Sequence, residues 1–515
     1  MGITTKTGKK MKTGKVYIAG AGCGDFELMT LKLKMLIEEA ECIIYDRLVN
    51  KEILALAPKS AELIYYGKDN CEGGLIQEKI NATLIEKAKE GKNVLRLKGG
   101  HPFVFGRGGE EALDLVDAGI EFEIIPGVTS AISVPAYAGI PISHRGINTS
   151  FHVFTGHSKD DGEKIDFETV SKLSGTLVFL MGIKNIEMIT SNLVNFGKIS
   201  STPVAVIENG STCHQRTVVG NLETISKIVE ENHIQSPSII IIGDVVNLRE
   251  KLAWFEHKAL HGHKVLVTSE KTQAKVTSRL VRSLGGESVE CPFFTLDKKS
   301  FTIPRLINFD TVLFTSPQSL HAFFEKIEDI RQLLHLRIGV AGEKTKEALN
   351  TYKLQANIYS NSYRTQELLN LLTEKEEKVL LVRSTSISAE LAVYSQSITE
   401  LETYYVDKVL RSDEEVIAYI NDVDIIAFPN ACTVKTLIDS VGREILATKL
   451  IIASNENTAL KIKSYGLHVN AFGNGEITEE TFKTCMETEH CIKGKKDGVV
   501  NRRNKGFTHS ARAAS

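Results

Sequence analysis

Short apolar runs alternate with longer stretches of helical periodicity along the first half of the chain. The runs are VYIAGAG, CIIYDRL, AELIYYG, NVLRLKGG, FEIIPG, FHVFTGH, TLVFLMG, PVAVIENG and SIIIIGDVV, and they extend from Val16 to Val246. Short apolar runs that are separated by helical segments are typical of α/β architecture. The pattern therefore predicts an α/β fold in which each run is a strand.

The second half repeats one local theme, in which an apolar run ends in a small polar residue. It occurs at residues 264–269, 311–316, 337–345, 378–384, 424–430 and 449–455. Each run precedes a helix-like stretch, which predicts parallel strands that end in Ser, Thr, Asn or Gly. Such strand ends face the ligand crevice of an open α/β sheet and would suit an anionic ligand. The alternative is that each small polar residue only caps the following helix.

A domain boundary is predicted near His261. The first set of runs closes at LREKLAWF, residues 248–255, and a new set begins at KVLVTS after the polar segment EHKALHGH. This segment contains three histidines, but no Cys, Asp or Glu stands at a matching ligand spacing. We therefore expect a linker at residues 257–263 and no metal site.

Composition supports several folded domains and excludes a membrane span. The 515 residues correspond to roughly three to four domains of average size. Hydrophobic residues make up 42% and charged residues 24%, and no apolar stretch is long enough to cross a bilayer. The N-terminus lacks the apolar segment of a signal peptide, and the eight cysteines form no CxxC pair. We expect a soluble cytoplasmic protein with free thiols.

Charge is distributed unevenly although the net charge is only −2. Residues 1–15 contain five Lys and no acidic residue, and residues 491–515 contain seven Lys or Arg and one Asp, so the middle of the chain carries about −13. The basic ends are short and lack interleaved aromatic residues, which argues against a nucleic-acid partner. Disordered tails at 1–14 and 488–515 are the better interpretation.

Three glycine-rich loops follow predicted strands in the first half. GAGCGD (20–25) resembles a dinucleotide-binding loop, but Asp25 stands where the third glycine of that motif belongs. The other two loops are LKGGHPFVFGRGGEE (97–111) and PGVTSAISVPAYAGIP (126–141). If the three strands belong to one sheet, these loops line one crevice, in which Val104 and Phe105 suit a flat heterocycle.

An ordered set of motifs gives the first half a specific resemblance. GAGCGDFELMTLKLKMLIEEA, IIYDRLV, YYGK, RLKGGHPFVFGRGGEE, PGVTSAISVPAYAGIPISHRG, FLMG, PVAVIENG and LAWF together resemble uroporphyrinogen-III C-methyltransferase over residues 15–256. The resemblance implies a two-domain tetrapyrrole methylase fold, a homodimer, and S-adenosylmethionine as the methyl donor. It also implies methylation of two pyrrole carbons of uroporphyrinogen III, which gives precorrin-2 for siroheme or cobalamin.

The resemblance also implies roles for individual residues. Asp46 matches the proposed proton acceptor and Lys68 the proposed proton donor, whereas Lys68, Arg47, Arg107 and Arg145 are candidates for the substrate carboxylates. The donor site maps to Cys23, Gly99, Gly100, His101, Val104, Thr129, Ser130, Met181 and Gly210. An electron-rich pyrrole carbon attacks the donor methyl directly, so the reaction needs no metal and no covalent nucleophile.

Two donor-site positions depart from the family pattern. Cys23 replaces a proline, which mainly removes rigidity from the turn. His101 replaces an aspartate, and loss of a carboxylate that pairs with the donor's amino group would weaken donor binding. The stretch KDNCEGG (68–74) also differs from the family's basic loop. We expect donor binding that is weakened but retained.

The second half resembles uroporphyrinogen-III synthase over residues 264–487. KVLVTSEKTQA, FDTVLFTSPQSLHAFF, RIGVAGEKTKEAL, RTQELLNLL, KVLLVRS, TYYV and DIIAFPN recur in order. The resemblance implies two similar α/β domains, with an inner domain at about 299–406, and cyclisation of hydroxymethylbilane. Binding positions match Ser316, Thr345, Asn430 and Asn457, and Tyr405 would assist departure of the hydroxyl. Ser269 and Asn457 depart from the usual Arg and Thr.

The two resemblances together predict a bifunctional enzyme. Its second half would make uroporphyrinogen III and its first half would methylate that product, and fusion would raise the local concentration of an unstable intermediate. One alternative is an active methyltransferase fused to a catalytically silent synthase-like domain that binds tetrapyrrole or serves in assembly. Another is methylation of a different corrin intermediate, which the motifs IIYDRLV and GRGGEE disfavour.

Overall fold

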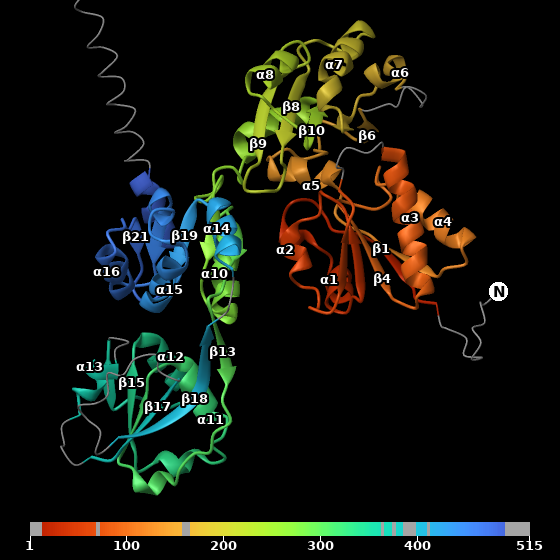
Figure 1. Cartoon of the computed structure of the whole chain (residues 1–515). Coiled ribbons are helices and arrows are strands. Elements are labelled where there is room, and N and C mark those ends of the chain that lie inside the picture. Colours follow the sequence, from red (N-terminus) through yellow and green to blue (C-terminus); the bar gives the residue numbers. More distant parts are fainter. Residues whose placement is uncertain are drawn as a thin grey trace, which may run out of the picture. The chain divides into compact units, whose positions relative to one another are not determined.

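A computed structural model describes residues 13–67, 73–156, 165–361, 365–372, 377–384, 398–408 and 412–489. The chain divides after Gly262 into two compact units, which Figure 1 colours from red to green and from green to blue. Each unit contains two five- or six-stranded sheets with helices packed on them, so the predicted α/β class is confirmed. Most of the two predicted tails lies outside the described residues.

The first sheet of unit 1 is parallel, with strand order β3-β2-β4-β1-β5. Its strands are β1 (Val16–Gly20), β2 (Cys42–Tyr45), β3 (Glu62–Tyr65), β4 (Val94–Lys98) and β5 (Phe122–Ile125). Helices cover both faces, which explains why these strands are nearly continuous apolar runs. One face packs against α1 (Leu31–Glu38) and α2 (Lys51–Leu54), and the other against α3 (Gly73–Lys89) and α4 (Gly108–Asp117).

The second sheet of unit 1 is mixed, with strand order β6-β7-β10-β8-β9. Its strands are β6 (Phe151–Thr155), β7 (Thr176–Leu180), β8 (Pro203–Glu208), β9 (Arg216–Asn221) and β10 (Ser238–Ile242). α5 (Ser130–Tyr137) packs on one face of this sheet, where its Ala131 and Val134 meet Ile207 and Ile239. The other face packs against α6 (Phe167–Ser171), α7 (Ile186–Asn195) and α8 (Ile225–Glu231).

The end of unit 1 differs from the linker expected at residues 257–263. α9 (Arg249–Leu252) is followed by a turn that packs against the rest of the unit. Leu260 is fully buried, the Gly262 N–H donates to the carbonyl of Cys213 at 2.8 Å, and the His261 ring lies 2.9 Å from the carbonyl of Gln215. The segment through Gly262 is therefore part of the first unit.

Unit 2 contains a parallel outer sheet of order β12-β11-β19-β20-β21. Its strands are β11 (Lys264–Val267), β12 (Glu287–Glu290), β19 (Ile425–Phe428), β20 (Leu450–Ala453) and β21 (Ala471–Phe472). The helices of this part are α10 (Lys271–Ser283), α14 (Asp413–Asn421), α15 (Ala431–Val441) and α16 (Glu456–Ser464).

The inner sheet of unit 2 has the order β13-β18-β17-β14-β15-β16. Its strands are β13 (Phe294–Lys298), β14 (Thr311–Phe314), β15 (Arg337–Ala341), β16 (Ile358–Ser360), β17 (Val379–Ser384) and β18 (Ile398–Lys408). It carries the helices α11 (Pro317–Phe324), α12 (Glu343–Thr351) and α13 (Thr365–Leu369). Antiparallel pairing of β13 with β18 extends the inner sheet beyond the expected range 299–406 to residues 294 and 408.

Short 3₁₀ helices lie at Phe26–Leu28, Ile183–Asn185, Asp244–Leu248, Leu306–Asn308, Ile330–Leu333 and Leu446–Thr448. Within the parts of the chain that the structure describes, no helix is long and apolar enough to cross a membrane.

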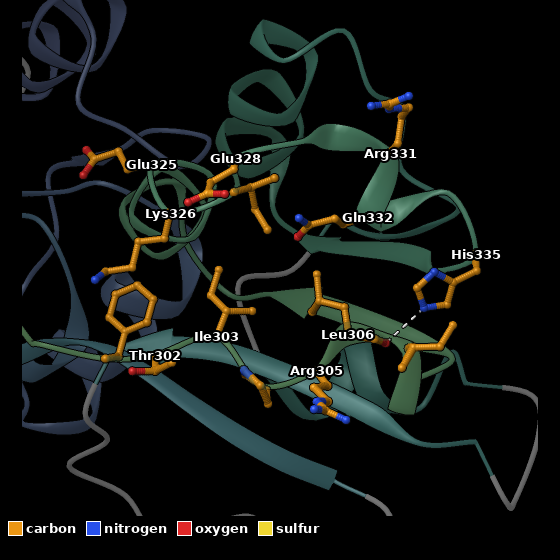
Figure 2. Close-up of a pocket in the computed structure, with 14 residues that line it drawn as sticks. Thr302, Ile303, Arg305, Leu306, Glu325, Lys326, Glu328, Arg331, Gln332 and His335 are labelled. Carbon is orange, nitrogen blue, oxygen red and sulfur yellow. Dashed lines mark hydrogen bonds between the residues drawn. The ribbon is translucent and has the colours of Figure 1, made fainter.

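A groove of about 930 Å³ lies beside the inner sheet (Figure 2). Residues 301–307, 325–328 and His335 line much of it, and the His335 ring lies 3.0 Å from the carbonyl of Leu306. This segment leads into the N-terminal end of β14, whereas Ser316 follows the opposite end. The groove contains none of the site residues that the sequence predicts.

Candidate active site

Three glycine loops meet at the C-terminal edge of the first sheet, after the adjacent strands β4, β1 and β5. Gly100 N–H donates to the carbonyl of Gly22 at 2.7 Å, and Gly22 N–H donates back at 3.2 Å. A Cβ added to Gly20 would lie 2.4 Å from the Gly100 carbonyl oxygen, and one added to Gly127 would lie 2.3 Å from the same atom. Only glycine permits this approach, so the predicted convergence of the three loops is confirmed.

Loops from the second sheet reach the same place. The Ser211 hydroxyl, after β8, donates to the carbonyl of Cys23 at 3.0 Å, and a Cβ on Gly24 would lie 2.9 Å from the carbonyl oxygen of Gly210. Gly210 also packs against Val134 of α5. The structure therefore brings the predicted donor residues Cys23 and Gly210 together from two sheets.

Several non-glycine residues in loops after the strands of unit 1 adopt left-handed backbone conformations. They lie in the loops after β4, β7 and β8 and are Phe105, Arg107, Met181, Asn209 and Ser211, with φ between 48° and 61°. Such conformations cost about 1–3 kcal/mol each and concentrate at functional sites. Met181 is also half exposed, and its contact with the donor stays a prediction.

The Cys23 thiol serves as a packing and hydrogen-bonding group. Its Sγ lies 2.6 Å from Ser133 Oγ and accepts from the Ser211 hydroxyl at 3.2 Å, and only 9% of the residue is exposed. Burial raises the pKa of this thiol, which opposes formation of a nucleophilic thiolate. Any contribution of Cys23 to donor binding would therefore come from its backbone.

Asp25 explains why the first loop lacks the dinucleotide-binding spacing. Its carboxylate accepts from the Glu27 N–H at 2.7 Å and from the Tyr137 hydroxyl at 2.5 Å. The side chain thus caps a short helix and ties the loop to α5, a task that glycine cannot perform. Thr129 caps α5 itself by accepting from the Ala131 N–H at 3.4 Å, so Ser130 is the first residue of that helix.

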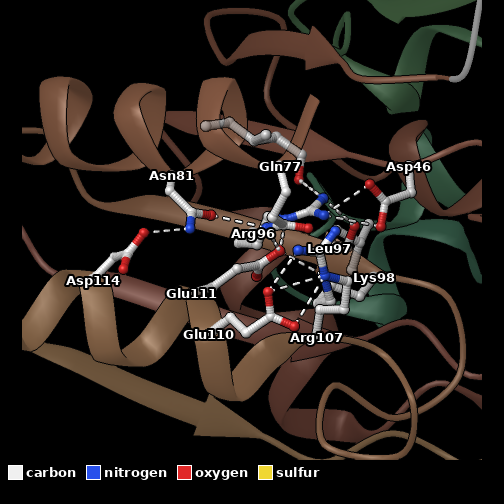
Figure 3. Close-up of polar contacts among 11 residues, drawn as sticks. Asp46, Gln77, Asn81, Arg96, Leu97, Lys98, Arg107, Glu110, Glu111 and Asp114 are labelled. Atoms are coloured by element: carbon white, nitrogen blue, oxygen red, sulfur yellow. Dashed lines mark hydrogen bonds and ion pairs between the residues drawn. The ribbon is translucent and has the colours of Figure 1, made fainter. Parts of the chain in front are cut away.

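Asp46 follows β2 and is held by a buried arginine (Figure 3). Nη2 of Arg96 lies 2.8 Å and 3.0 Å from the two Asp46 carboxylate oxygens. Arg96 Nε lies 3.2 Å from Glu111 Oε1, which also accepts from Lys98 Nζ at 2.6 Å. Burial, together with the charge of Arg96, lowers the pKa of Lys98. Only Asp46 of these four residues is substantially exposed.

Sequence reasoning missed Arg96, Lys98 and Glu111. One signal was available, because VLRLK places two cations at alternate positions of a strand whose five residues are all buried. Alternate residues of a strand point to one face of the sheet, so both cations had to find carboxylates there. The identity of the partner on α4 depended on the fold.

The remaining basic candidates are placed differently. Arg47 and Arg145 are exposed, and Arg107 forms a 2.6 Å ion pair with Glu110. Two further donor-site candidates are Gly99 and Val104. Gly99 lies against Leu48, because a Cβ added to Gly99 would be 3.1 Å from the Cβ of Leu48, and Val104 is half-buried. Lys68 lies outside the described residues.

The predicted residues of unit 2 lie mainly at helix starts. Ser316 and Asn430 cap α11 and α15 by accepting from the backbone N–H of Ser319 and Thr433, and their contact with substrate stays a prediction. Thr345 is fully buried in α12, and its contact with substrate stays a prediction. Asn457 is exposed in the first turn of α16, and the side chain of Tyr405 in β18 lies outside the described part.

His101 makes a turn of the kind that aspartate makes. Its Nδ1 accepts from the Phe103 N–H at 3.1 Å, so the ring replaces a carboxylate as acceptor without its negative charge. We expect His101→Asp to keep this turn and to tighten S-adenosylmethionine binding about 10- to 100-fold, because a charged pair is restored. Calorimetric titration with S-adenosylmethionine measures this.

The matched control for that substitution is His233→Asp, at an exposed left-handed position of the same unit. It should leave donor affinity unchanged. Equal or weaker binding by His101→Asp would show that a carboxylate at this position does not contact the donor.

Comparisons with known proteins agree with this arrangement. The model of the tetrapyrrole (corrin/porphyrin) methylases matches residues 15–226, and that of uroporphyrinogen-III synthase HemD matches residues 275–473. A Ruminiclostridium josui protein named porphyrin biosynthesis protein HemD is 34% identical over 89% of this chain and 95% of its own length. Bacillus subtilis uroporphyrinogen-III C-methyltransferase is 40% identical over 66% of this chain and 72% of its own.

A solved structure is similar to part of the chain. Uroporphyrin-III C-methyltransferase from Thermus thermophilus, in complex with S-adenyl homocysteine, is 37% identical and covers 46% of this chain and 94% of its own, with a TM-score of 0.40.

The first unit is thus a tetrapyrrole methylase whose glycine loops and Asp46 lie at one sheet edge. The whole chain belongs to the family in which this methylase is followed by a uroporphyrinogen-III synthase domain, and it is a bifunctional enzyme of tetrapyrrole biosynthesis. Both predicted family memberships are confirmed.

Proposed function

We propose that the first unit transfers methyl groups from S-adenosylmethionine to two pyrrole carbons of uroporphyrinogen III and releases precorrin-2. We further propose that the second unit supplies uroporphyrinogen III by cyclising hydroxymethylbilane. The observation that carries the first assignment is the meeting of Gly20, Gly100 and Gly127 at the sheet edge where Asp46 also lies, after β2. The enzyme would act in the cytoplasm as a homodimer formed by its methyltransferase unit.

The crevice has the chemistry that S-adenosylmethionine needs. A Cβ on Gly100 would have Ser130 N as its nearest neighbour at 4.0 Å, so this side of the glycine is open toward the start of α5. N–H groups at a helix start favour a carboxylate such as that of the donor. The residues that would hold the donor are Gly99, Gly100, His101, Val104, Thr129, Ser130, Met181 and Gly210. The bound donor supplies a methyl group on a positively charged sulfur.

Asp46 would accept the proton that the substrate loses after methylation. The methylated ring carbon carries no hydrogen, so this proton comes from a pyrrole nitrogen or a bridging carbon of the cation that forms. The Asp46 side chain is 29% exposed, so the carboxylate reaches the surface. The buried Arg96 contacts both carboxylate oxygens and fixes their position. A carboxylate in a fixed position is suited to general base catalysis. Arg47, Arg107 and Arg145 would bind substrate carboxylates, and Lys68 would act as proton donor.

The second unit would bind hydroxymethylbilane at the strand ends of its two sheets. The starts of α11 and α15, capped by Ser316 and Asn430, present backbone N–H groups that favour substrate carboxylates. Tyr405 in β18 would assist departure of the hydroxyl before ring D is inverted. Holding a reactive substrate in a folded conformation accounts for much of such catalysis.

Replacing Tyr405 by phenylalanine should lower the rate of uroporphyrinogen III formation by about 10-fold or more, because the phenol no longer protonates the leaving hydroxyl. The assay supplies the full chain with hydroxymethylbilane and no methyl donor, and separates isomers I and III. Tyr465→Phe, in the outer part of the same unit, is the control. An unchanged rate for Tyr405→Phe would remove this residue from the mechanism.

An anaerobic assay of the full chain with uroporphyrinogen III and S-adenosylmethionine tests the methyltransferase. Precorrin-2, followed by absorbance, is the expected product. No product from uroporphyrinogen III, but turnover of a later corrin intermediate, would instead identify a relative with another substrate. In a second sample, formation of only uroporphyrinogen I from hydroxymethylbilane would show that the synthase domain is catalytically silent.

A further inference from the structure

Four charged side chains gather at the end of β4, and three of them are almost fully buried. The exposed fractions are 1% for Arg96, 5% for Lys98 and 0% for Glu111, against 29% for Asp46. Buried charges are costly, and apolar residues of similar size often stabilise a core equally well. The one member that reaches the surface is the proposed proton acceptor. This arrangement points to a role in the reaction.

Arg96 is held rigidly by contacts in several directions. One side of its guanidinium meets both oxygens of Asp46, and Nε meets Glu111. Its Nη1 donates to the carbonyl of Leu97 at 3.3 Å and lies 3.5 Å from that of Ile44. A planar fork with five N–H donors can make these contacts at once, whereas an ammonium group cannot.

Glu111 anchors the arrangement from α4. Its Oε1 accepts from Arg96, from Lys98 and from Gln77 Nε2 at 3.0 Å (Figure 3). Gln77 belongs to α3 and also donates to Asn81. Strand β4 and helices α3 and α4 therefore jointly fix the position of the guanidinium, and the two cations balance the charges of the two carboxylates.

We propose that Arg96, held by Glu111, is the positioning residue of the methyltransferase and acts through the Asp46 carboxylate. This inference rests on the proposed function, because it takes Asp46 as the proton acceptor. Only 1% of the Arg96 side chain is exposed, too little to bind tetrapyrrole or donor. Its effect on turnover must therefore pass through Asp46, and this dependence separates it from a residue that only stabilises the fold.

The test is a double-mutant cycle on the full chain with Arg96→Lys and Asp46→Asn. Methylation of uroporphyrinogen III gives kcat and KM, calorimetry with S-adenosylmethionine gives donor affinity, and thermal unfolding reports folding. Lysine keeps the positive charge but lacks the planar guanidinium that contacts Asp46 and Glu111 at once. We expect Arg96→Lys to lower kcat about 10- to 50-fold with donor affinity changed less than about twofold. In the Asp46→Asn background, Arg96→Lys should lower kcat less than about twofold.

Arg216→Lys is the control, because Arg216 pairs with the buried Glu208 on the other sheet of unit 1 at 2.5 Å. It should leave kcat unchanged. If Arg96→Lys does not fold, Glu111→Gln replaces it in the cycle. Glutamine removes the negative charge that holds the guanidinium at Nε, and the same non-additivity is expected.

Equal losses from Arg96→Lys in both backgrounds, or a parallel loss of donor affinity, would overturn the positioning role while leaving the proposed function intact. A wild-type kcat for Asp46→Asn alone would instead remove Asp46 as proton acceptor and the inference with it.

Discussion

Replacing Asp46 by asparagine should lower kcat for methylation by about 10²- to 10⁴-fold, because an amide cannot accept the proton that the methylated substrate releases. Asparagine has the same shape, and its carbonyl oxygen still accepts from Arg96, so folding and donor binding should change little. Steady-state kinetics with uroporphyrinogen III under anaerobic conditions, together with calorimetry on S-adenosylmethionine, separates these effects.

Asp166→Asn is the matched control for this prediction. Asp166 caps the short helix α6 by accepting from the Thr169 N–H at 3.1 Å, and it takes no part in the crevice. It should leave kcat unchanged. Wild-type turnover by Asp46→Asn would show that another group, or water, takes the proton.

Replacing Gly20 by alanine should disrupt the crevice itself. The new Cβ would lie 2.4 Å from the Gly100 carbonyl oxygen and 2.8 Å from Gly127 Cα, and both neighbours are backbone atoms that cannot rotate away. We expect a loss of about 1–3 kcal/mol in the free energy of unfolding as the loops move apart. Donor affinity should fall at least about 10-fold, because loop positions misplaced by about 1 Å no longer match the ligand.

Urea denaturation and calorimetry with S-adenosylmethionine measure the two effects of Gly20→Ala. Gly109→Ala is the control, since a Cβ at Gly109 in α4 would meet nothing within 4 Å. This variant should keep its donor affinity, and its free energy of unfolding should rise by about 0.5–1 kcal/mol, because alanine suits a helix better than glycine. Unchanged stability and affinity for Gly20→Ala would contradict the close contact of the three loops.

Much of the fold could be predicted because buried strands have simple apolar runs. β10 is a clear case, since all five residues of SIIII are buried between α5 and the helices on the other face. β9 was missed because its residues are exposed or half-buried and include Arg216 and Gly220. That strand exists through antiparallel pairing with β8, which local sequence does not reveal.

The candidate site was predictable where backbone shape dominates and less so where side chains from distant segments meet. The glycines at positions 20, 100 and 127 marked the three loops, although the adjacency of β4, β1 and β5 came only from the fold. The pairing of Arg96 with Glu111 spans a strand and a helix. Thr345 shows the opposite case, because a small polar residue after a strand turned inward.

The most direct test of both proposed activities is one anaerobic reaction of the full chain with hydroxymethylbilane and S-adenosylmethionine. Precorrin-2 is the expected product, since the second unit would form uroporphyrinogen III and the first would methylate it. A parallel sample receives uroporphyrinogen III in place of hydroxymethylbilane. If the first sample yields only uroporphyrinogen I and the parallel sample keeps its uroporphyrinogen III unmethylated, both proposed activities are contradicted.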